Sequence, residues 1–346
     1  MLNRKRRKLE HLKYSLLFEK KLSREVFNDV KIVHNCLSEI NIDEIDISTN
    51  LKGIQLKTPI VINAITGGMR EGYIINRELA KVARDLNLAM AVGSQKIAIA
   101  YKAAEKSFSI VRKINPEGII FANIGADATI ADAQKTVEMV QANALQLHLN
   151  VPQELAMREG RRKFKGTLEN ILHIAQNIKV PVIVKEVGFG MSQDEAKLLV
   201  DNKIQILDIG GYGGTNFVAI ENARNKSLAL KSLENWGIPT APSLIEVVNK
   251  VGSDADIICS GGLETGLDVA KALALGAKAA ALAGSPLYIL YKEGTSALCK
   301  HILNMERVLK YTMAMSGANN ILELGQRPTV VIGKTREWLK YRGIRA

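Results

Sequence analysis

Residues 144–154 read ALQLHLNVPQE, and the fold of the chain can be worked out from this stretch. Its first part alternates like a buried β-strand, and its second part is polar. The polar side chains are those of His148, Asn150, Gln153 and Glu154. Buried polar groups without partners lose several hydrogen bonds, so such a strand tip is costly in a core and could form a site. Taken alone, the stretch favours a capped turn, with Asn150 as N-cap and Gln153 at N3 of a helix over residues 152–160.

The same arrangement recurs, which favours the site. We expect eight short apolar strands with polar or glycine-rich ends, at 60–63, 89–92, 118–122, 144–147, 180–184, 204–209, 256–259 and 277–282. Helical patterns separate most of them, at 76–86, 102–114, 130–141, 193–201 and 266–275. Near-continuous apolar strands are typical of parallel sheets that are covered on both faces. Eight strand–helix units in roughly 250 residues predict a (β/α)₈ barrel; a doubly wound open sheet is the alternative.

Two segments flank the repeats. We predict an N-terminal extension or lid over residues 1–57, and a barrel with a closing helix and basic tail over 58–346. Residues 3–21 are basic, and leucines at 2, 9, 12, 16 and 17 could line one side of a helix. On that helix Arg7 and His11 share a face and Lys8 flanks them. The segment is either a solvated, nucleic-acid-attracting arm or a lid over an anionic substrate.

Composition narrows the class of partner. The net charge of +12 suits an anionic ligand, nucleic acid or an acidic membrane surface. Aromatic residues are 5% of the chain, which argues against base stacking on single strands. Three widely spaced cysteines without a CxxC motif indicate a reducing compartment. No apolar run is long enough for a membrane span and no signal-peptide core begins the chain, so we expect a soluble cytoplasmic protein.

Glycines after the last two strands predict a phosphate site. Gly261 and Gly262 follow the seventh strand, and Ala283 and Gly284 follow the eighth. Without bulky side chains, their backbone N–H groups can approach a phosphate, and a helix N-terminus behind them adds a favourable dipole. In barrels this pair of loops often binds phosphate. The alternative is that the glycines only form turns.

Two charged residues each have two possible roles. Lys185 ends an apolar strand and needs an anion, because an unpaired buried ammonium is prohibitively costly. It could form a structural ion pair with Glu154 or Asp208, or stabilise negative charge on a cofactor ring. Glu154 could be a helix-start carboxylate or a ligand of Mg²⁺. A single carboxylate suits a magnesium ion that also binds a substrate diphosphate.

Taken together, these motifs resemble type 2 isopentenyl-diphosphate isomerases. The resemblance runs in order and at matching spacing from the N-terminal basic motif to the eighth strand. It rests on Arg7-Lys8-x-x-His11, NAITGG at 63–68, AVGSQ at 91–95, NIGAD at 123–127, HLNVPQE at 148–154, KEVGFG at 185–190, GGTNF at 213–217 and SGG at 260–262. It implies an FMN- and Mg²⁺-dependent barrel enzyme that interconverts isopentenyl and dimethylallyl diphosphate, with NADPH reducing the flavin. It also implies a homo-oligomer with a small-molecule substrate and neither nucleic acid nor membrane as partner.

The resemblance assigns roles residue by residue. FMN contacts are implied for Ala64, Ile65, Thr66, Ser94, Asn123, Lys185 and Thr215, with its phosphate near Gly261, Gly262, Leu263, Ala283 and Gly284. The substrate diphosphate would be bound by Arg7, Lys8, His11, Ser94, Gln95, Lys96 and Gln153. His148, Asn150 and Gln153 would act on the substrate and Glu154 would hold Mg²⁺. The chain departs from the family at Gly210, Glu264 and Gly284, where Ser, Arg and Arg are frequent, which predicts weaker binding of the flavin phosphate.

The reaction fits these residue types. Moving a double bond by one carbon needs protonation at one end and deprotonation at the other, and the chain offers no obvious strong acid there. A reduced flavin could serve as acid and base. Lys185 would favour its anionic form, and Gln153 would orient or relay a proton. Three other functions stay open: an FMN barrel of the 2-hydroxy acid oxidase kind, a basic nucleic-acid-binding protein, and a flavin-poor relative that keeps only the scaffold.

Overall fold

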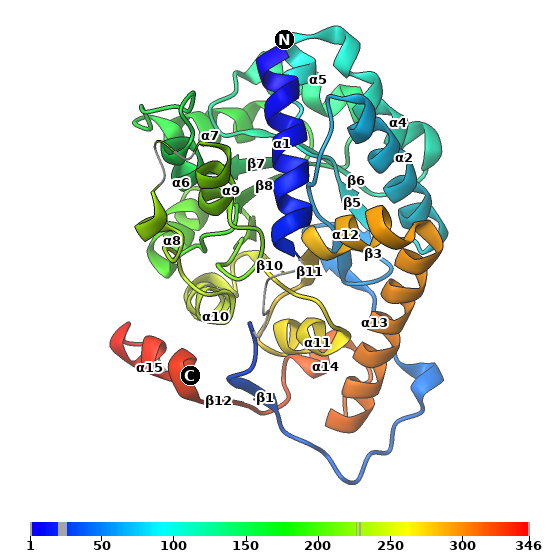
Figure 1. Cartoon of the computed structure of the whole chain (residues 1–346). Coiled ribbons are helices and arrows are strands. Elements are labelled where there is room, and N and C mark those ends of the chain that lie inside the picture. The colour runs from blue at the N-terminus through cyan, green and yellow to red at the C-terminus, as the bar shows by residue number, and fades with distance from the viewer. Residues whose placement is uncertain (1, 20–25, 226, 228–229, 345–346) are drawn as a thin grey trace.

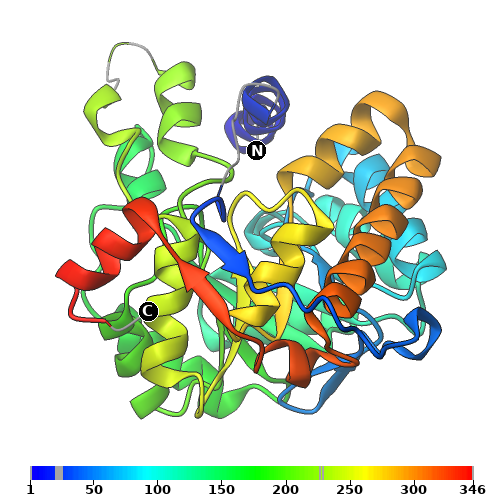
Figure 2. The ribbon, with the colours of Figure 1, turned by 90° about the horizontal axis from the view of Figure 1, so that it is seen from below.

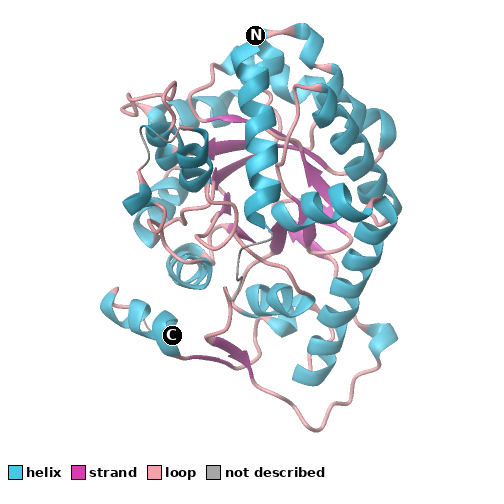
Figure 3. Cartoon of the chain, viewed as in Figure 1, coloured by secondary structure: helices cyan, strands magenta, loops and turns pink. Residues whose placement is uncertain are grey.

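Eight parallel strands close into a barrel in the computed structural model, which describes residues 2–19, 26–225, 227 and 230–344. Figure 3 shows the strands gathered inside a ring of helices. The strands are β4 (Ile60–Ile62), β5 (Ala89–Ala91), β6 (Ile120–Gly125), β7 (Ala144–Leu149), β8 (Val182–Glu186), β9 (Ile206–Asp208), β10 (Asp256–Ser260) and β11 (Ala279–Leu282). They pair in chain order, and β11 pairs with β4 to close the ring. The predicted (β/α)₈ barrel is therefore confirmed.

Helices follow the strands and cover the barrel. The longer ones are α2 (Arg70–Asp85), α4 (Lys106–Ile114), α5 (Ile130–Val140), α7 (Thr167–Asn177), α8 (Gln193–Asp201), α10 (Thr240–Val251), α11 (Gly266–Ala274) and α13 (Thr295–Ser316). The other helical elements are α3 (Lys96–Ala100), η2 (Lys102–Ala104), α6 (Val151–Ala156), α9 (Phe217–Arg224), η4 (Lys231–Leu233), α12 (Gly284–Glu293), α14 (Ile321–Leu324) and α15 (Gly333–Tyr341). The sequence patterns did not indicate α7 or α10. No helix in the described ranges is both long and apolar enough to cross a membrane.

A hairpin closes the amino end of the barrel. Strands β2 (Thr49–Leu51) and β3 (Ile54–Leu56) pair antiparallel. Their side chains Leu51, Ile54 and Leu56 are buried in one cluster with residues inside the barrel, among them Phe121 and Ile183. The turn between the strands has positive φ at Lys52 (44°) and Gly53 (95°), as a tight hairpin turn requires. This apolar plug leaves the carboxyl ends of the strands as the open end.

Most of the predicted extension is built into the barrel body. Strand β1 (Val30–Ile32) pairs with β12 (Thr329–Val331), which ties the two ends of the chain together (Figure 2). Residues 42–44 form a short 3₁₀ turn, η1 (Ile42–Glu44), and Asp46 then makes one isolated bridge to Asn320. The described part of the first fifty-seven residues thus contains α1, one strand paired with β12, and the hairpin.

Helix α1 (Leu2–Glu19) lies across the open end of the barrel, as Figure 1 shows from the front and Figure 2 end-on. It packs against α9 and α12. Leu12 and Leu16 face the core, whereas Leu9 and Leu17 are 41% and 49% exposed, so the predicted leucine stripe is only partly right. Residues 20–21 of the predicted basic segment, and Arg345 of the basic tail, lie outside the described residues.

Candidate active site

A cavity of about 1220 Å³ opens at the carboxyl ends of the strands, beneath α1. Every barrel strand or the loop after it contributes to its lining, as the fold class predicts. The structure brings into it the predicted residues Arg7, Lys8, His11, Ala64, Ile65, Thr66, Ser94, Lys96, Asn123, His148, Asn150, Gln153, Glu154, Lys185, Thr215, Gly261, Gly262, Leu263, Ala283 and Gly284. This volume exceeds that of an ordinary small-ligand pocket, so it has room for a cofactor and a substrate together.

Gln95 is the predicted site residue that does not line the cavity. Its side chain is fully buried. The Nε2 group donates to the backbone oxygen of Thr136 at 2.9 Å, and Oε1 accepts from the backbone N–H of Asn123 at 3.0 Å. Gln95 thus links β6 to α5, whereas its neighbours Ser94 and Lys96 line the cavity.

Lys185 is buried in an ion pair with Asp208. The two residues are register partners on β8 and β9, and Lys185 Nζ lies 2.9 Å from Asp208 Oδ2. Of the two anions that the sequence allowed, the structure thus places Asp208, not Glu154, beside the ammonium. Asp208 also accepts from Asn63 Nδ2 at 2.8 Å and from the Ser260 hydroxyl. The pair, which is neutral overall, fixes the position of the Lys185 ammonium at the cavity lining.

Polar side chains continue from this pair to His148. Gln146 Nε2 donates to Asn63 Oδ1 at 3.0 Å, and Asn123 Nδ2 donates to Gln146 Oε1 at 2.8 Å. His148 Nδ1 lies 2.8 Å from Asn123 Oδ1. Burial lowers the pKa of His148 to about 4, and nearby lysines add to the effect while Asp127 opposes it. His148 is therefore a neutral imidazole in the ligand-free protein at pH 7.

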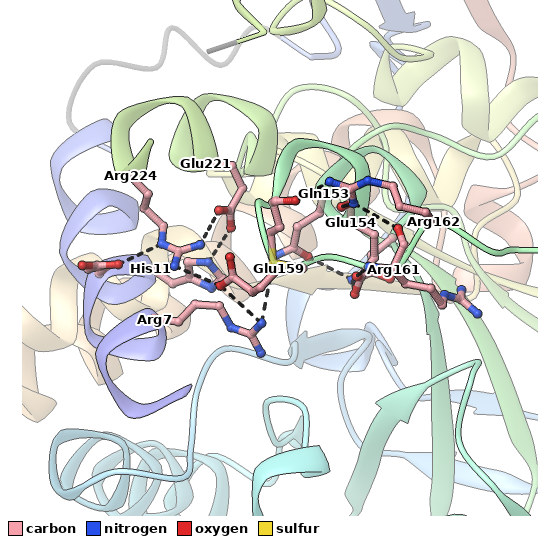
Figure 4. Close-up of polar contacts among 12 residues, drawn as sticks. Arg7, His11, Gln153, Glu154, Glu159, Arg161, Arg162, Glu221 and Arg224 are labelled. Atoms are coloured by element: carbon pink, nitrogen blue, oxygen red, sulfur yellow. Dashed lines mark hydrogen bonds and ion pairs between the residues drawn. The ribbon is translucent and has the colours of Figure 1, made fainter. Parts of the chain in front are cut away.

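The polar residues after β7 agree in part with each interpretation of the sequence, the functional site and the capped turn. Asn150 stands at the N-cap position of α6, but its side chain makes no capping hydrogen bond. Its Nδ2 group instead donates to Gln153 Oε1 at 3.2 Å and to Glu154 Oε1 at 3.3 Å. Glu154 Oε2 accepts from the backbone N–H of Arg161 at 2.6 Å (Figure 4). Helix α6 ends at Ala156, earlier than residue 160, and its first-turn side chains face the cavity.

Ion pairs fasten α1 over the cavity. His11 Nε2 lies 2.6 Å from Glu221 Oε1 on α9, and Arg7 Nη1 lies 3.7 Å from Glu159 Oε1. Arg224 contacts Glu10 at 3.0 Å, Glu159 at 3.2 Å, and Glu221 (Figure 4). These acidic partners and Arg224 were not predicted from the sequence, because its patterns indicated no helix at α9. The contacts fix the face of α1 that carries Arg7 and His11 toward the site.

Lys8 reaches deepest from α1. Its Nζ donates to the backbone oxygen of Ser94 at 3.1 Å and lies 5.5 Å from the centre of the Phe108 ring. Burial, with the charge of Arg7 beside it, lowers the pKa of Lys8 to about 7. An anion entering the cavity would therefore meet a lysine that is ready to take up a proton.

The glycine loops after β10 and β11 form a cradle without side chains. At Gly261, φ is +117° and a Cβ would lie 2.2 Å from the backbone oxygen of Gly211. At Gly262, φ is +88° and a Cβ would lie 2.2 Å from the backbone oxygen of Gly213, so neither position has room for a side chain. Helix α12 begins at Gly284, so its N-terminus faces the same loops. Backbone N–H groups and a helix dipole are what a phosphate needs, and the cradle fits that group.

Two of the three departures from the family pattern have a local explanation. Gly210 has φ +48° and a Cβ there would lie 2.1 Å from the oxygen of Glu186, so serine does not fit this backbone. At Gly284 a Cβ would lie 2.3 Å from Glu19 Oε2, so a side chain from α1 takes the adjacent space. Glu264 does not line the cavity, so its charge does not enter the predicted phosphate position.

The described residues contain no group of three or more His, Cys, Asp and Glu side chains that could hold a metal ion. Glu154 therefore offers a single carboxylate at the cavity wall. A magnesium ion at this point would need oxygen ligands from a bound diphosphate and from water.

Comparison with known proteins places the chain among flavin barrels and isomerases. The family model of FMN-dependent dehydrogenases matches residues 122–331. An isopentenyl-diphosphate delta-isomerase of Symbiobacterium thermophilum is 46% identical over 319 residues, which cover 92% of this chain and 88% of that protein. The protein of the same name from Bacillus cytotoxicus is 47% identical over 342 residues, covering 99% and 97%.

Among solved structures, a mandelate oxidase with (S)-2-phenylpropionate is similar in fold. It superposes with a TM-score of 0.64 over 92% of this chain and 90% of that one, at 17% sequence identity. At this identity the likeness concerns the barrel alone. The much higher identity to the isomerases separates them from the oxidases as relatives of this chain.

Proposed function

This chain belongs to the isopentenyl-diphosphate delta-isomerase family and to the FMN-dependent dehydrogenases, and from that premise we propose that it interconverts isopentenyl and dimethylallyl diphosphate with a bound flavin. One observation carries the proposal at the level of residues. Arg7, Lys8 and His11 of α1 enter the same cavity as the polar strand tips and the glycine cradle. The residues that we propose for the diphosphate and those that we propose for the flavin thus line one cavity.

The residues present fit FMN. The cradle at Gly261, Gly262 and the start of α12 would hold the phosphate, and Lys185 would place a positive charge beside the isoalloxazine. When bound, reduced FMN would supply an acid–base group and an electron-rich surface that stabilises a cationic centre. Thr66 and Asn123, which line the same cavity, are proposed to contact the ring, together with Ala64. NADPH is the reductant that we expect, and its role would end with reduction of the flavin.

The substrate diphosphate would be bound by polar side chains from two directions. Arg7, Lys8 and His11 come from α1, and Lys96 is the first residue of α3, which follows β5. Lys96 lies 2.5 Å from Asp127, Arg7 is paired with Glu159, and His11, whose pKa is lowered by burial, is hydrogen-bonded to Glu221, so these three side chains are already oriented. Glu154 would hold Mg²⁺ together with the diphosphate oxygens. Closure by α1 would exclude water from a reactive cation.

Gln153 is the residue that we propose to orient or relay the proton. Its Oε1 accepts from Asn150, so its NH₂ group is the end available to the cavity. An amide is too weak an acid to act alone, so Gln153 would work with the flavin. Asn150 would set its orientation, and His148 would contact the substrate or the ring from the neighbouring strand tip.

The decisive experiment is anaerobic incubation with FMN, Mg²⁺, NADPH and isopentenyl diphosphate in D₂O. We expect dimethylallyl diphosphate that carries deuterium, because the shift takes a proton from solvent. Gln153→Ala should lose isomerisation with FMN still bound, and Lys185→Ala should lose the flavin itself. An FMN-loaded protein that makes no allylic product but oxidises a 2-hydroxy acid would refute the proposal. Failure to bind FMN at all would support the flavin-poor scaffold.

Cellular context and assembly stay predictions. We expect a cytoplasmic homo-oligomer, and sedimentation of the FMN-loaded protein would give its mass. We favour a small-molecule substrate over nucleic acid because Arg7 and Lys8 of α1 line the cavity, although Arg6 and Lys13 are exposed. Retention of the purified protein on single-stranded DNA at physiological salt would argue against this view.

A further inference from the structure

A chain of hydrogen-bonded side chains crosses the barrel from Asp208 to His148. Asn63 Nδ2 donates to Asp208 Oδ2 at 2.8 Å, Gln146 Nε2 to Asn63 Oδ1 at 3.0 Å, and Asn123 Nδ2 to Gln146 Oε1 at 2.8 Å. His148 Nδ1 completes the chain, 2.8 Å from Asn123 Oδ1. The first four residues are at most 2% exposed, so water does not offer them alternative partners.

The direction of this chain is fixed at the Asp208 end. The Asp208 carboxylate is paired with an ammonium and can only accept hydrogen bonds. The backbone N–H of Ala64 can only donate, and it donates to Asn63 Oδ1 at 2.8 Å. The amide of Asn63 therefore has one possible orientation, with Nδ2 toward Asp208 and Oδ1 toward Gln146.

The orientation of each amide determines the orientation of the next one in the chain. Because Asn63 presents an oxygen, Gln146 must present its NH₂ group there and its oxygen to Asn123. Asn123 in turn donates to Gln146 and presents its oxygen to His148. A carbonyl oxygen only accepts, so the proton on the imidazole must be on Nδ1.

We propose that Asp208, Asn63 and Gln146 are positioning residues that hold His148 as the Nδ1–H tautomer, with the lone pair of Nε2 offered to the cavity. The neutral state needed for this is supported by burial, which lowers the pKa of His148, and by Lys96, Lys185 and Lys8, which lower it further. Asp127 acts in the opposite direction. The Nε2 side of the ring adjoins Gly125, which also lines the cavity; a Cβ there would lie 3.4 Å from Nε2.

The consequence for catalysis rests on the proposed function. A neutral ring with a free Nε2 lone pair accepts a hydrogen bond from a donor on the bound flavin or substrate. It neither donates a proton at that atom nor forms an ion pair with the diphosphate. His148 thus differs in kind from His11, whose Nε2 faces a carboxylate.

The test is ¹⁵N NMR of histidine-labelled, flavin-free protein at pH 8, which reads the tautomer independently of activity. The chain has five histidines, and loss of one signal set in His148→Gln assigns the ring. We expect a protonated Nδ1 and an unprotonated Nε2 in the wild type. A wild-type ring protonated on Nε2 would overturn the proposal, even if the protein proves to be an isomerase. Conversely, absence of isomerase activity would leave the tautomer result standing.

Variants test whether the chain of amides sets the tautomer. In Gln146→Leu, Asn123 is free to rotate and present its NH₂ group, so we expect a large Nε2–H population. Adding Asn123→Asp should restore Nδ1–H, because a carboxylate only accepts. Ile183→Val, at the register partner of Gln146 inside the barrel, is the matched control and should keep the wild-type tautomer. A tautomer unchanged in folded Gln146→Leu would refute the relay, as would failure of Asn123→Asp to restore it.

Discussion

Replacing Asp208 by Asn should destabilise the flavin-free protein strongly, although the shapes of the two side chains are the same. The substitution leaves Lys185 charged in a buried position, with the Glu186 backbone oxygen at 3.1 Å and the Ser260 hydroxyl at 3.4 Å as its other partners. Breaking a buried pair in this way costs about 3–5 kcal/mol. At about 2.1 cal/mol/K of unfolding entropy per residue, the 346 residues convert this loss into a Tm decrease of about 4–7 °C.

Truncating the other partner, Lys185, should reduce the free energy of unfolding by less. Lys185→Met leaves Asp208 with three donors: Asn63 Nδ2, the Ser260 hydroxyl and the backbone N–H of Gly210 at 3.2 Å. We therefore expect a loss of about 1–3 kcal/mol. In the double variant no buried charge remains, so adding Lys185→Met to Asp208→Asn should raise the Tm.

Differential scanning calorimetry of the four flavin-free proteins measures this cycle. The matched control is Lys197→Met, which removes an ion pair with Asp201 at 2.8 Å whose two side chains are 50% and 57% exposed, and should cost under about 0.5 kcal/mol. The reasoning fails if the double variant melts below Asp208→Asn. It fails equally if Lys185→Met costs as much as Asp208→Asn.

Three further perturbations have defined outcomes. Because burial and Arg7 lower the pKa of Lys8 to about 7, binding of inorganic diphosphate at pH 8 should take up a proton. The calorimetric heat should then depend on the buffer, and Lys8→Met should remove this dependence. Burial raises the pKa of Glu186 to about 8, so the folded protein binds more protons than the unfolded chain between about pH 4.5 and 8 and loses stability across that window. Glu186→Gln should therefore raise the Tm more at pH 9 than at pH 5. Gly261→Ala should abolish FMN retention on gel filtration, whereas Gly53→Ala, with similar φ but nothing within 4 Å, should retain the flavin.

The barrel was predictable because its strands are covered on both faces and therefore read as short apolar runs. Helix α10 was not predicted, although it keeps an amphipathic pattern: Pro242 lies in its first turn, where a helix tolerates proline, and most of its residues are buried. Helix α7 begins after Gly166 without a side-chain cap, so the sequence carried no start signal. Local patterns thus identified strands better than the helices between them.

The site was predictable to the extent that the barrel brings strand ends together. The burial of Gln95 between Ser94 and Lys96 could not be read from the sequence, because Gln95 precedes α3 in a turn rather than in a strand. The partners of α1 could not be read from the sequence, because Glu221 lies 210 residues from His11. Gln146 gave a signal as a polar residue inside an apolar strand, but its role depends on Asn63 and Asp208 across the barrel.

In the part of the chain that the structure describes, the hairpin of β2 and β3 fills one end of the barrel with Leu51, Ile54 and Leu56. The cavity for cofactor and substrate therefore lies at the opposite end, beneath α1. The molecule that binds nearer the strand tips must therefore bind first and dissociate last. A flavin bound at the glycine cradle could not dissociate while a diphosphate is bound between it and α1. Turnover and cofactor exchange would therefore exclude each other.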